Sequence, residues 1–275
     1  MRMTELTDKA PIPRGTPIKM KKQRQPYNKR LFGKGIRGWA HRARFRWLSR
    51  KVRQYGSAPY SVVELGCYDA KSITFLDSLP QAYLGLDANW ESGLDLARKR
   101  WAGHPEFEFI QCRSPEALES SAGANISQRT GKYNIALCME TLEHLPEHLV
   151  GPYLRLLRQL TDGYVFITVP VEIGPVFLIK YLVKRIITRD GEKYRLREIL
   201  CAALGLSRHV ERNQHKGFDW RRLREEVGAV FDIVEVSGMP FSPLPPMLNF
   251  GVGIVARTPD SQSDLQKPGT SSSPD

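Results

Sequence analysis

The chain has 275 residues, of which 41% are apolar and 25% charged, as in an ordinary soluble globular protein. This composition excludes fibrous and disulfide-rich classes. The net charge of +12 is uneven, because residues 1–55 hold 17 Lys or Arg against Glu5 and Asp8, which leaves −3 for the remainder. The four cysteines show no paired spacing, which is typical of reduced thiols. Without an apolar signal or a run of about 20 apolar residues, a cytoplasmic protein is expected, with a peripheral membrane position left open.

The two ends of the chain differ in composition from its middle. Residues 1–35 are rich in Pro, Lys and Arg, which predicts a flexible basic arm, and the few apolar residues of 258–275 predict a disordered tail. Residues 36–257 are expected to form one domain. The arm could bind nucleic-acid phosphates, anionic lipid headgroups or an acidic partner, and a merely solvated segment explains it equally well.

Strand and helix patterns alternate through the first part of this domain. A basic amphipathic helix at 36–55 is expected to pack beside the first strand. Short apolar strands are predicted at 61–65, 83–87, 107–111, 133–139 and 164–169. Helices are predicted between them at 71–79, 90–102 and 146–160. Strands separated by helices of this length indicate βαβ units and a parallel sheet.

The pattern changes after the fifth strand. Residues 171–216 are too long for a βα connection, so they are expected to form a helical insertion above the sheet. Its helical runs are 174–187 and about 195–204. A helix at 218–228 precedes strands at 231–239 and 249–257, which should pair antiparallel because no helix separates them. The predicted fold is α/β, with a mostly parallel seven-stranded sheet, helices on both faces and an antiparallel last strand.

The segment VVELGCYDAKS at 62–72 carries the first sign of a ligand site. Gly66 follows the strand and would allow a ligand to approach the backbone closely. Asp87 closes the next strand about 20 residues later, where a carboxylate can accept hydrogen bonds from both ribose hydroxyls. The dinucleotide fingerprint G-x-G-x-x-G is missing, because Tyr68 stands where it requires glycine. Glu64 favours a cationic ligand over a pyrophosphate.

Three segments together resemble a known enzyme family. VVELGCYDAKS (62–72) and YLGLDAN (83–89) are similar to the first two motifs of class I S-adenosylmethionine-dependent methyltransferases. YNIALCMETLEHL (133–145) is similar to the fourth-strand segment of the ubiquinone-pathway O-methyltransferases and their type-11 relatives. The resemblance covers roughly residues 57–257. It implies a methyltransferase that uses S-adenosylmethionine.

The resemblance also implies where the cofactor lies. Glu64 and Gly66 would line its methionine end, Asp87 its ribose, and Ala88 and Asn89 its adenine. The full expected set is Glu64, Gly66, Cys67, Tyr68, Asp87, Ala88, Asn89, Ser114, Cys138 and Met139.

This chain departs from the family pattern at the glycine loop and carries cysteines near the site. Tyr68 and Ala70 replace two motif glycines, so a less tightly turned loop is expected unless Tyr68 points outward. Cys67, Cys112 and Cys138 all follow strands and could approach one another. Packing beneath the cofactor is favoured over a thiolate metal site, and no metal is expected.

Methyl transfer from a sulfonium is an in-line displacement, in which the protein positions the acceptor and removes its proton. His144 is the best base candidate, because the carboxylates of Glu140 and Glu143 precede it and would raise its pKa. The competing interpretation is a helix start capped by His144. In similar enzymes a histidine at the position of His215 borders the active site, which suggests acceptor contact; the alternative is a loop histidine bonded to backbone.

The acceptor is expected to be a small molecule, a glycan or a lipid-linked intermediate that is methylated on oxygen. The insertion at 171–216 would cap its pocket. The apolar helix at 174–187 could lie at a membrane interface, although burial of its apolar face on the domain is favoured. A nucleic-acid methyltransferase that uses the basic arm is a weaker alternative, and a catalytically silent binding protein is a third. The sequence leaves the oligomeric state open.

Overall fold

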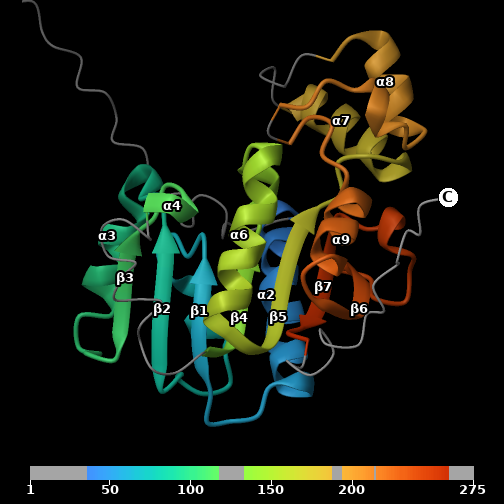
Figure 1. Cartoon of the computed structure of the whole chain (residues 1–275). Coiled ribbons are helices and arrows are strands. Elements are labelled where there is room, and N and C mark those ends of the chain that lie inside the picture. The colour runs from blue at the N-terminus through green and yellow to red at the C-terminus, as the bar shows by residue number, and fades with distance from the viewer. Residues whose placement is uncertain (1–35, 118–132, 188–193, 214, 260–275) are drawn as a thin grey trace, which may run out of the picture.

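A computed structural model describes residues 36–117, 133–187, 194–213 and 215–259 (Figure 1). The predicted arm at 1–35 and most of the predicted tail lie outside these residues.

One sheet of seven strands organises the described residues, in the order β3-β2-β1-β4-β5-β7-β6. The strands are β1 (Ser61–Leu65), β2 (Ala82–Asp87), β3 (Phe107–Gln111), β4 (Tyr133–Met139), β5 (Thr161–Pro170), β6 (Asp232–Met239) and β7 (Gly251–Arg257). The pairs from β3 to β5 are parallel, whereas β7 runs antiparallel to both β5 and β6. The predicted mostly parallel sheet with a reversed last strand is confirmed.

Helices cover both faces of this sheet. The α-helices are α2 (Ile36–Tyr55), α3 (Gly93–Arg100), α4 (Pro115–Ala117), α6 (Glu147–Leu160), α7 (Pro175–Ile187), α8 (Leu196–Ala203) and α9 (Trp220–Gly228). Short 3₁₀ turns are η1 (Lys71–Phe75), η2 (Trp90–Ser92), η4 (Leu142–His144), η5 (Ser207–His209) and η6 (Pro246–Leu248). One apolar cluster lies between the sheet and α6 with α9, and the other between the sheet and α2 with α3.

Two predicted helices differ from the structure. The helix expected at 71–79 is only the turn η1, which ends at Leu76 in extended backbone. The β-branched Ile73 and Thr74 at its centre are weak helix formers. The helix expected at 90–102 begins as η2, where Glu91 has a φ of 47°, so the regular helix starts only at Gly93.

Helix α2 packs across β5, β6 and β7, and its apolar residues share a cluster with Val62 of β1. Its packing therefore extends beyond the expected position beside the first strand. Its Trp47 is fully buried, and the indole N–H donates to Ser237 Oγ at 2.9 Å. Farther along, Lys51 Nζ and Tyr55 Oη donate to Glu235 Oε2 at 2.6 and 2.9 Å. These bonds hold the first described helix against β6, near the end of the chain.

Helices α7 and α8 lie within the segment predicted to be a helical insertion. They pack on each other around Phe177, Ala202 and Val210. Figure 1 shows both beyond the arrow tips of the sheet, at the end where the parallel strands finish. None of the described helices is long and apolar enough to cross a membrane.

Candidate functional site

A cavity of about 520 Å³ opens at the carboxyl ends of β1, β2 and β4. The order of the sheet reverses between β1 and β4, and open α/β sheets bind ligands at such a point. Ten residues expected from the sequence line this cavity: Glu64, Gly66, Cys67, Tyr68, Asp87, Ala88, Met139, Glu140, His144 and His215.

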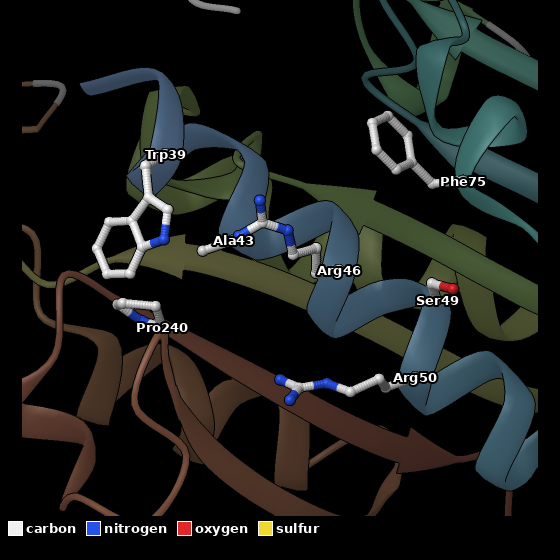
Figure 2. Close-up of a pocket in the computed structure, with 7 residues that line it drawn as sticks. All are labelled: Trp39, Ala43, Arg46, Ser49, Arg50, Phe75 and Pro240. Atoms are coloured by element: carbon white, nitrogen blue, oxygen red, sulfur yellow. The ribbon is translucent and has the colours of Figure 1, made fainter. Parts of the chain in front are cut away.

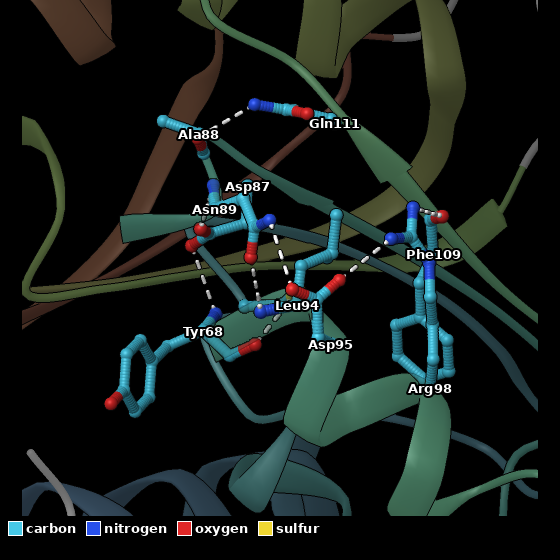
Figure 3. Close-up of polar contacts among 10 residues, drawn as sticks. Tyr68, Asp87, Ala88, Asn89, Leu94, Asp95, Arg98, Phe109 and Gln111 are labelled. Atoms are coloured by element: carbon cyan, nitrogen blue, oxygen red, sulfur yellow. Dashed lines mark hydrogen bonds and ion pairs between the residues drawn. The ribbon is translucent and has the colours of Figure 1, made fainter. Parts of the chain in front are cut away.

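Three residues expected at the cofactor do not line the cavity. Cys138 is completely buried in the apolar cluster on the α6 side of the sheet. The side chain of Asn89 accepts a hydrogen bond from the Leu94 N–H at 3.1 Å and donates to Asp95, so it holds the start of α3 (Figure 3). Ser114 lies just beyond Cys112 and Arg113, which do line the cavity.

The turn after β1 adopts the tight left-handed backbone that glycine favours, although only one of its residues there is glycine. Gly66 has a φ of 72°, and a Cβ on it would stand 2.1 Å from Thr141 Oγ1, so a side chain does not fit. Tyr68 and Ala70 have φ values of 47° and 49°. Of the two alternatives expected here, the looser loop is therefore wrong. The Tyr68 ring packs near Trp90, with ring centroids 6.1 Å apart.

Glu64 provides a buried carboxyl group at this turn, and its side chain is almost inaccessible. Ser72 Oγ and Tyr83 Oη both donate to its Oε2. Burial raises the pKa of Glu64 to about 7, against the opposing effect of these two hydrogen bonds. At neutral pH the group is thus poised between its two forms, and a nearby cation would complete its ionisation.

Asp87 lies across the cavity at the end of β2. Its Oδ2 accepts the Tyr68 N–H at 2.9 Å and its Oδ1 accepts the Asn89 N–H at 2.7 Å, as Figure 3 shows. Burial raises the pKa of Asp87, and these backbone hydrogen bonds oppose that rise. The carboxylate keeps further lone pairs that can accept hydroxyl donors. The next loop is tied down by Gln111 Nε2, which donates to the carbonyl of Ala88 at 3.1 Å.

Glu143, His144 and His215 gather at another corner of the site. One potential ligand atom from each lies within 4.8 Å of the others, and the two imidazole rings meet edge to face, with centroids 4.4 Å apart. The Glu143 side chain is fully buried, and neither of its oxygens has a hydrogen-bond partner in the described part of the chain. Burial, followed by the charge of Glu140, raises the pKa of Glu143 well above its usual value.

Two imidazoles and one carboxylate form a donor set that fits a divalent cation, and a buried carboxyl group without a partner is a position that such an ion would satisfy. The expectation that the protein uses no metal is untested. This corner of the site nevertheless offers the ligands for one.

The pKa of His144 is lowered, mainly by burial and then by the charges of Arg212 and Arg44. The expectation that a neighbouring carboxylate raises it is wrong, because the carboxyl group of Glu143 is itself buried and favours its neutral form. His144 lies in η4, three residues before α6 begins at Glu147. Its ring is therefore neutral at neutral pH and keeps a lone pair for a proton or a metal.

Arg44 of α2 also lines the cavity, and sequence reasoning missed it. Its Nη1 lies 3.2 Å from Glu140 Oε2. Glu140 has a φ of 53°, and its N–H donates to the carbonyl of Thr168 at 2.8 Å. The basic pattern of α2 shows that arginines are present, but the pattern cannot show which of them reaches the cleft.

A second hollow of about 460 Å³ lies on another side of α2 (Figure 2). It is lined by Trp39, Ala43, Arg46, Ser49, Arg50, Phe75 and Pro240. Arg46 and Arg50 project from one side of the helix, and neither forms an ion pair with any side chain that the structure describes. Without a carboxylate, this hollow does not suit a cationic nucleoside, but it does suit an anion.

No family model and no curated protein matches the sequence. Solved structures do match. Magnesium protoporphyrin IX methyltransferase from Synechocystis PCC 6803, with S-adenosylhomocysteine bound, has a TM-score of 0.52 at 15% identity over 84% of this chain and 92% of that one. The 1,6-didemethyltoxoflavin-N1-methyltransferase of Burkholderia thailandensis gives 0.50 at 17% identity over 81% of both chains. The small RNA methyltransferase HEN1 gives 0.55 at 16% identity over 88% of this chain and 27% of that one. The chain therefore has the fold of the class I S-adenosylmethionine-dependent methyltransferases.

Proposed function

We propose that the protein is an S-adenosylmethionine-dependent methyltransferase that methylates a hydroxyl oxygen of a small-molecule, glycan or lipid-linked acceptor. The observation that carries this proposal is one cavity bordered by Glu64 and Asp87 on one side and by His144 and His215 on another. Structures of the same fold with bound S-adenosylhomocysteine support the choice of cofactor.

Each wall of the cavity matches one part of the methyl donor, S-adenosylmethionine. Asp87 would accept hydrogen bonds from the ribose hydroxyls, because its carboxylate is fixed by two backbone N–H groups and retains free lone pairs. Glu64 would face the ammonium group of the methionine end, where an opposite charge favours its ionised form. The tight turn at Gly66 lets the cofactor approach the backbone between these carboxylates.

The transfer itself forms a bond between the acceptor oxygen and the methyl carbon while the carbon–sulfur bond breaks and its electrons return to sulfur. A hydroxyl acceptor must lose its proton, and the neutral ring of His144 is placed to take it. A divalent cation held by Glu143, His144 and His215 would occupy the same His144 lone pair, so with such an ion bound its Lewis acidity, and not the His144 ring, would lower the pKa of the acceptor hydroxyl group. The ion pair between Arg44 and Glu140 keeps this side of the cleft in place.

Calorimetric titration with S-adenosylhomocysteine tests the cofactor site. The wild-type protein should bind, and Asp87→Ala should lose binding while remaining folded. Asp95→Ala is a matched control, because Asp95 lies in the same segment with an exposed side chain. Absence of both binding heat and thermal stabilisation in the wild type would support the catalytically silent alternative.

Incubation of a cell extract with labelled donor tests the acceptor class. Label should enter oxygen-methylated small molecules, glycans or lipids, and EDTA should slow the transfer if a cation takes part. Transfer to nitrogen or carbon would contradict this assignment.

A nucleic-acid acceptor is the second candidate. The observations that favour it are Arg46 and Arg50 beside Trp39 in the second hollow, and the fold shared with a small RNA methyltransferase. RNA binding through phosphates would weaken steeply as salt rises, and Arg46→Gln with Arg50→Gln would flatten that dependence. Label that remains in small molecules or lipids would exclude this candidate.

A further inference from the structure

The exposed apolar side chains of this protein are concentrated in one region. Of the fifteen large apolar residues that stand exposed in the described chain, twelve lie on α7, on α8 with the turn after it, or in the loop between β6 and β7. They are Leu178, Ile179, Leu182, Val183, Leu196, Leu200, Leu204, Leu206, Phe241, Leu244, Met247 and Leu248. An apolar concentration of this kind marks an interaction surface rather than ordinary scatter. We call these twelve residues the cap surface.

Helix α7 is apolar on two faces, and the domain covers only one of them. Val176 and Phe177 are buried at 7% and 3% exposure. Ile179 and Leu182, in contrast, are 58% and 49% exposed. Together with Leu178 and Val183 they follow the i, i+1, i+4, i+5 spacing of a single helix face. Packing against the domain therefore covers one apolar face of α7, whereas the second apolar face is not covered by any part of the chain that the structure describes.

Helix α8 repeats this arrangement. Leu196, Leu200 and Leu204 are spaced by four residues and are 75%, 58% and 75% exposed. The inward side holds Ala202, which is fully buried, and Glu198, whose Oε1 lies 2.9 Å from Lys216 Nζ. The remaining members of the cap surface lie in the β6–β7 loop, whose η6 turn packs against α7.

Most of the exposed charges described around the cap surface are positive. The exposed charged side chains of the described residues between 174 and 210 are Arg185, Arg195, Arg197 and Arg208. The one acidic residue described in that range, Glu198, points inward to its ion pair. Residues 240–250 carry no charge at all. The described part of this region thus combines exposed apolar side chains with a mainly cationic rim, beside which Glu211, with its side chain 82% exposed, is an acidic neighbour.

We propose that the cap surface docks the protein on an anionic lipid bilayer. A second copy of the chain would bring like charges together, and the basic segment 1–35 is repelled for the same reason. Residues 260–275 contain one large apolar side chain, Leu265, which is too few to cover the surface. An anionic bilayer provides both the apolar phase and the negative headgroups, and helices with an exposed apolar face flanked by basic residues lie in its interface.

The cap surface is joined to the acceptor side of the cleft. The segment after α8 supplies His215 to the cavity, and Arg212 Nη2 donates to the carbonyl of Glu143 at 3.2 Å. Given the methyl transfer proposed above, the acceptor is an amphiphile that reaches the cleft from the bilayer. The docking surface itself does not depend on that activity.

Co-sedimentation of the full chain with vesicles tests the docking. The protein should bind phosphatidylglycerol–phosphatidylcholine vesicles and bind pure phosphatidylcholine much more weakly. Ile179→Ser with Leu182→Ser, and separately Leu196→Ser with Leu200→Ser, should each lower the binding constant roughly tenfold or more. Each of Arg185→Gln and Arg197→Gln should lower it about fivefold. Leu79→Ser with Val234→Ser is the matched control, because these residues are similarly exposed but lie outside the cap surface.

Three results would overturn the proposal. If the wild-type protein does not co-sediment with anionic vesicles, the cap surface is not a membrane-docking surface. If both double variants bind anionic vesicles as tightly as the wild type, another segment, such as residues 1–35, binds the membrane. A concentration-dependent dimer that the same variants abolish would identify a second copy as the occupant. All variants should keep the wild-type melting temperature and affinity for S-adenosylhomocysteine. A wild-type protein that does not bind S-adenosylhomocysteine would contradict the proposed function and leave the vesicle-binding result unaffected.

Discussion

Replacing Glu64 by Gln tests whether the carboxyl group at the first turn is held in the unusual state that the structure indicates. The side chain is 3% exposed, and burial raises its pKa from 4.5 to about 7. Glutamine has nearly the same shape, and its carbonyl oxygen can accept the hydrogen bonds from Ser72 and Tyr83. The substitution therefore removes the titration while largely keeping the packing.

The sign of the effect follows from proton binding. Between pH 4.5 and about 7 the folded protein keeps a proton on Glu64 that the unfolded chain has lost. The unfolded state then binds fewer protons, so the free energy of unfolding falls as pH rises through this window. The difference between the ordinary and the folded-state pKa of Glu64 corresponds to about 3 kcal/mol of unfolding free energy. This contribution is lost completely once the pH exceeds the folded-state pKa.

Urea denaturation of wild type and Glu64→Gln from pH 4.5 to 8.5 measures this component. The stability of the variant relative to wild type should rise by about 3 kcal/mol across the range. Glu211→Gln is the control, because that side chain is 82% exposed, and its profile should follow the wild type. Parallel profiles for wild type and Glu64→Gln would refute the reasoning.

The same carboxyl group should respond to the cofactor. An ammonium group beside Glu64 would hold it ionised, so binding of S-adenosylhomocysteine near pH 6.5 should release a proton. The release appears in calorimetry as a binding heat that depends on the ionisation enthalpy of the buffer. Glu64→Gln should show no such dependence.

Three further substitutions have defined outcomes. Gly66→Ala should cost about 2 kcal/mol or more in urea denaturation and should weaken S-adenosylhomocysteine binding, because a side chain there meets a left-handed backbone and a clash; wild-type stability would contradict the described turn. Trp47→Phe should destabilise the fold by about 2 kcal/mol, because it removes the hydrogen bond to Ser237 and leaves a void. A loss below about 0.5 kcal/mol, the scale of a surface substitution, would show that this contact contributes little to stability. His144→Ala should lower kcat while calorimetry finds unchanged cofactor affinity; a wild-type rate would remove His144 from the mechanism.

Much of the fold could be predicted because each strand is a short apolar run between clear breaks. The spacing of Gly66 and Asp87 likewise located the cavity, since parallel strands bring their carboxyl ends to one edge. The conformation of the glycine loop could not be predicted. Tyr68 and Ala70 argue locally against a left-handed turn, and the penalty of about 1–2 kcal/mol per residue is overcome only by tertiary packing.

The corner around Glu143 was equally inaccessible to sequence reasoning. An acidic residue near a helix start is normally solvated, so the pattern ETLEHL does not indicate a carboxyl group with no exposure. Its side chain lies beside that of His215, which is about seventy positions away in the chain. Arg44 was missed for the same reason, because only the long-range packing of α2 selects it for the cleft.

The attachment of α2 to β6 has a consequence for biosynthesis. The hydrogen bond from Trp47 to Ser237 spans 190 positions, and those from Lys51 and Tyr55 to Glu235 span 184 and 180. A ribosome therefore finishes α2 long before the surface that receives it has been translated. Until β6 emerges, Trp47 lacks its burial site and Arg44 lacks the anchorage that directs it to Glu140. A nascent chain that ends before β6 would display an exposed aromatic helix beside an incomplete cleft, a natural substrate for a chaperone.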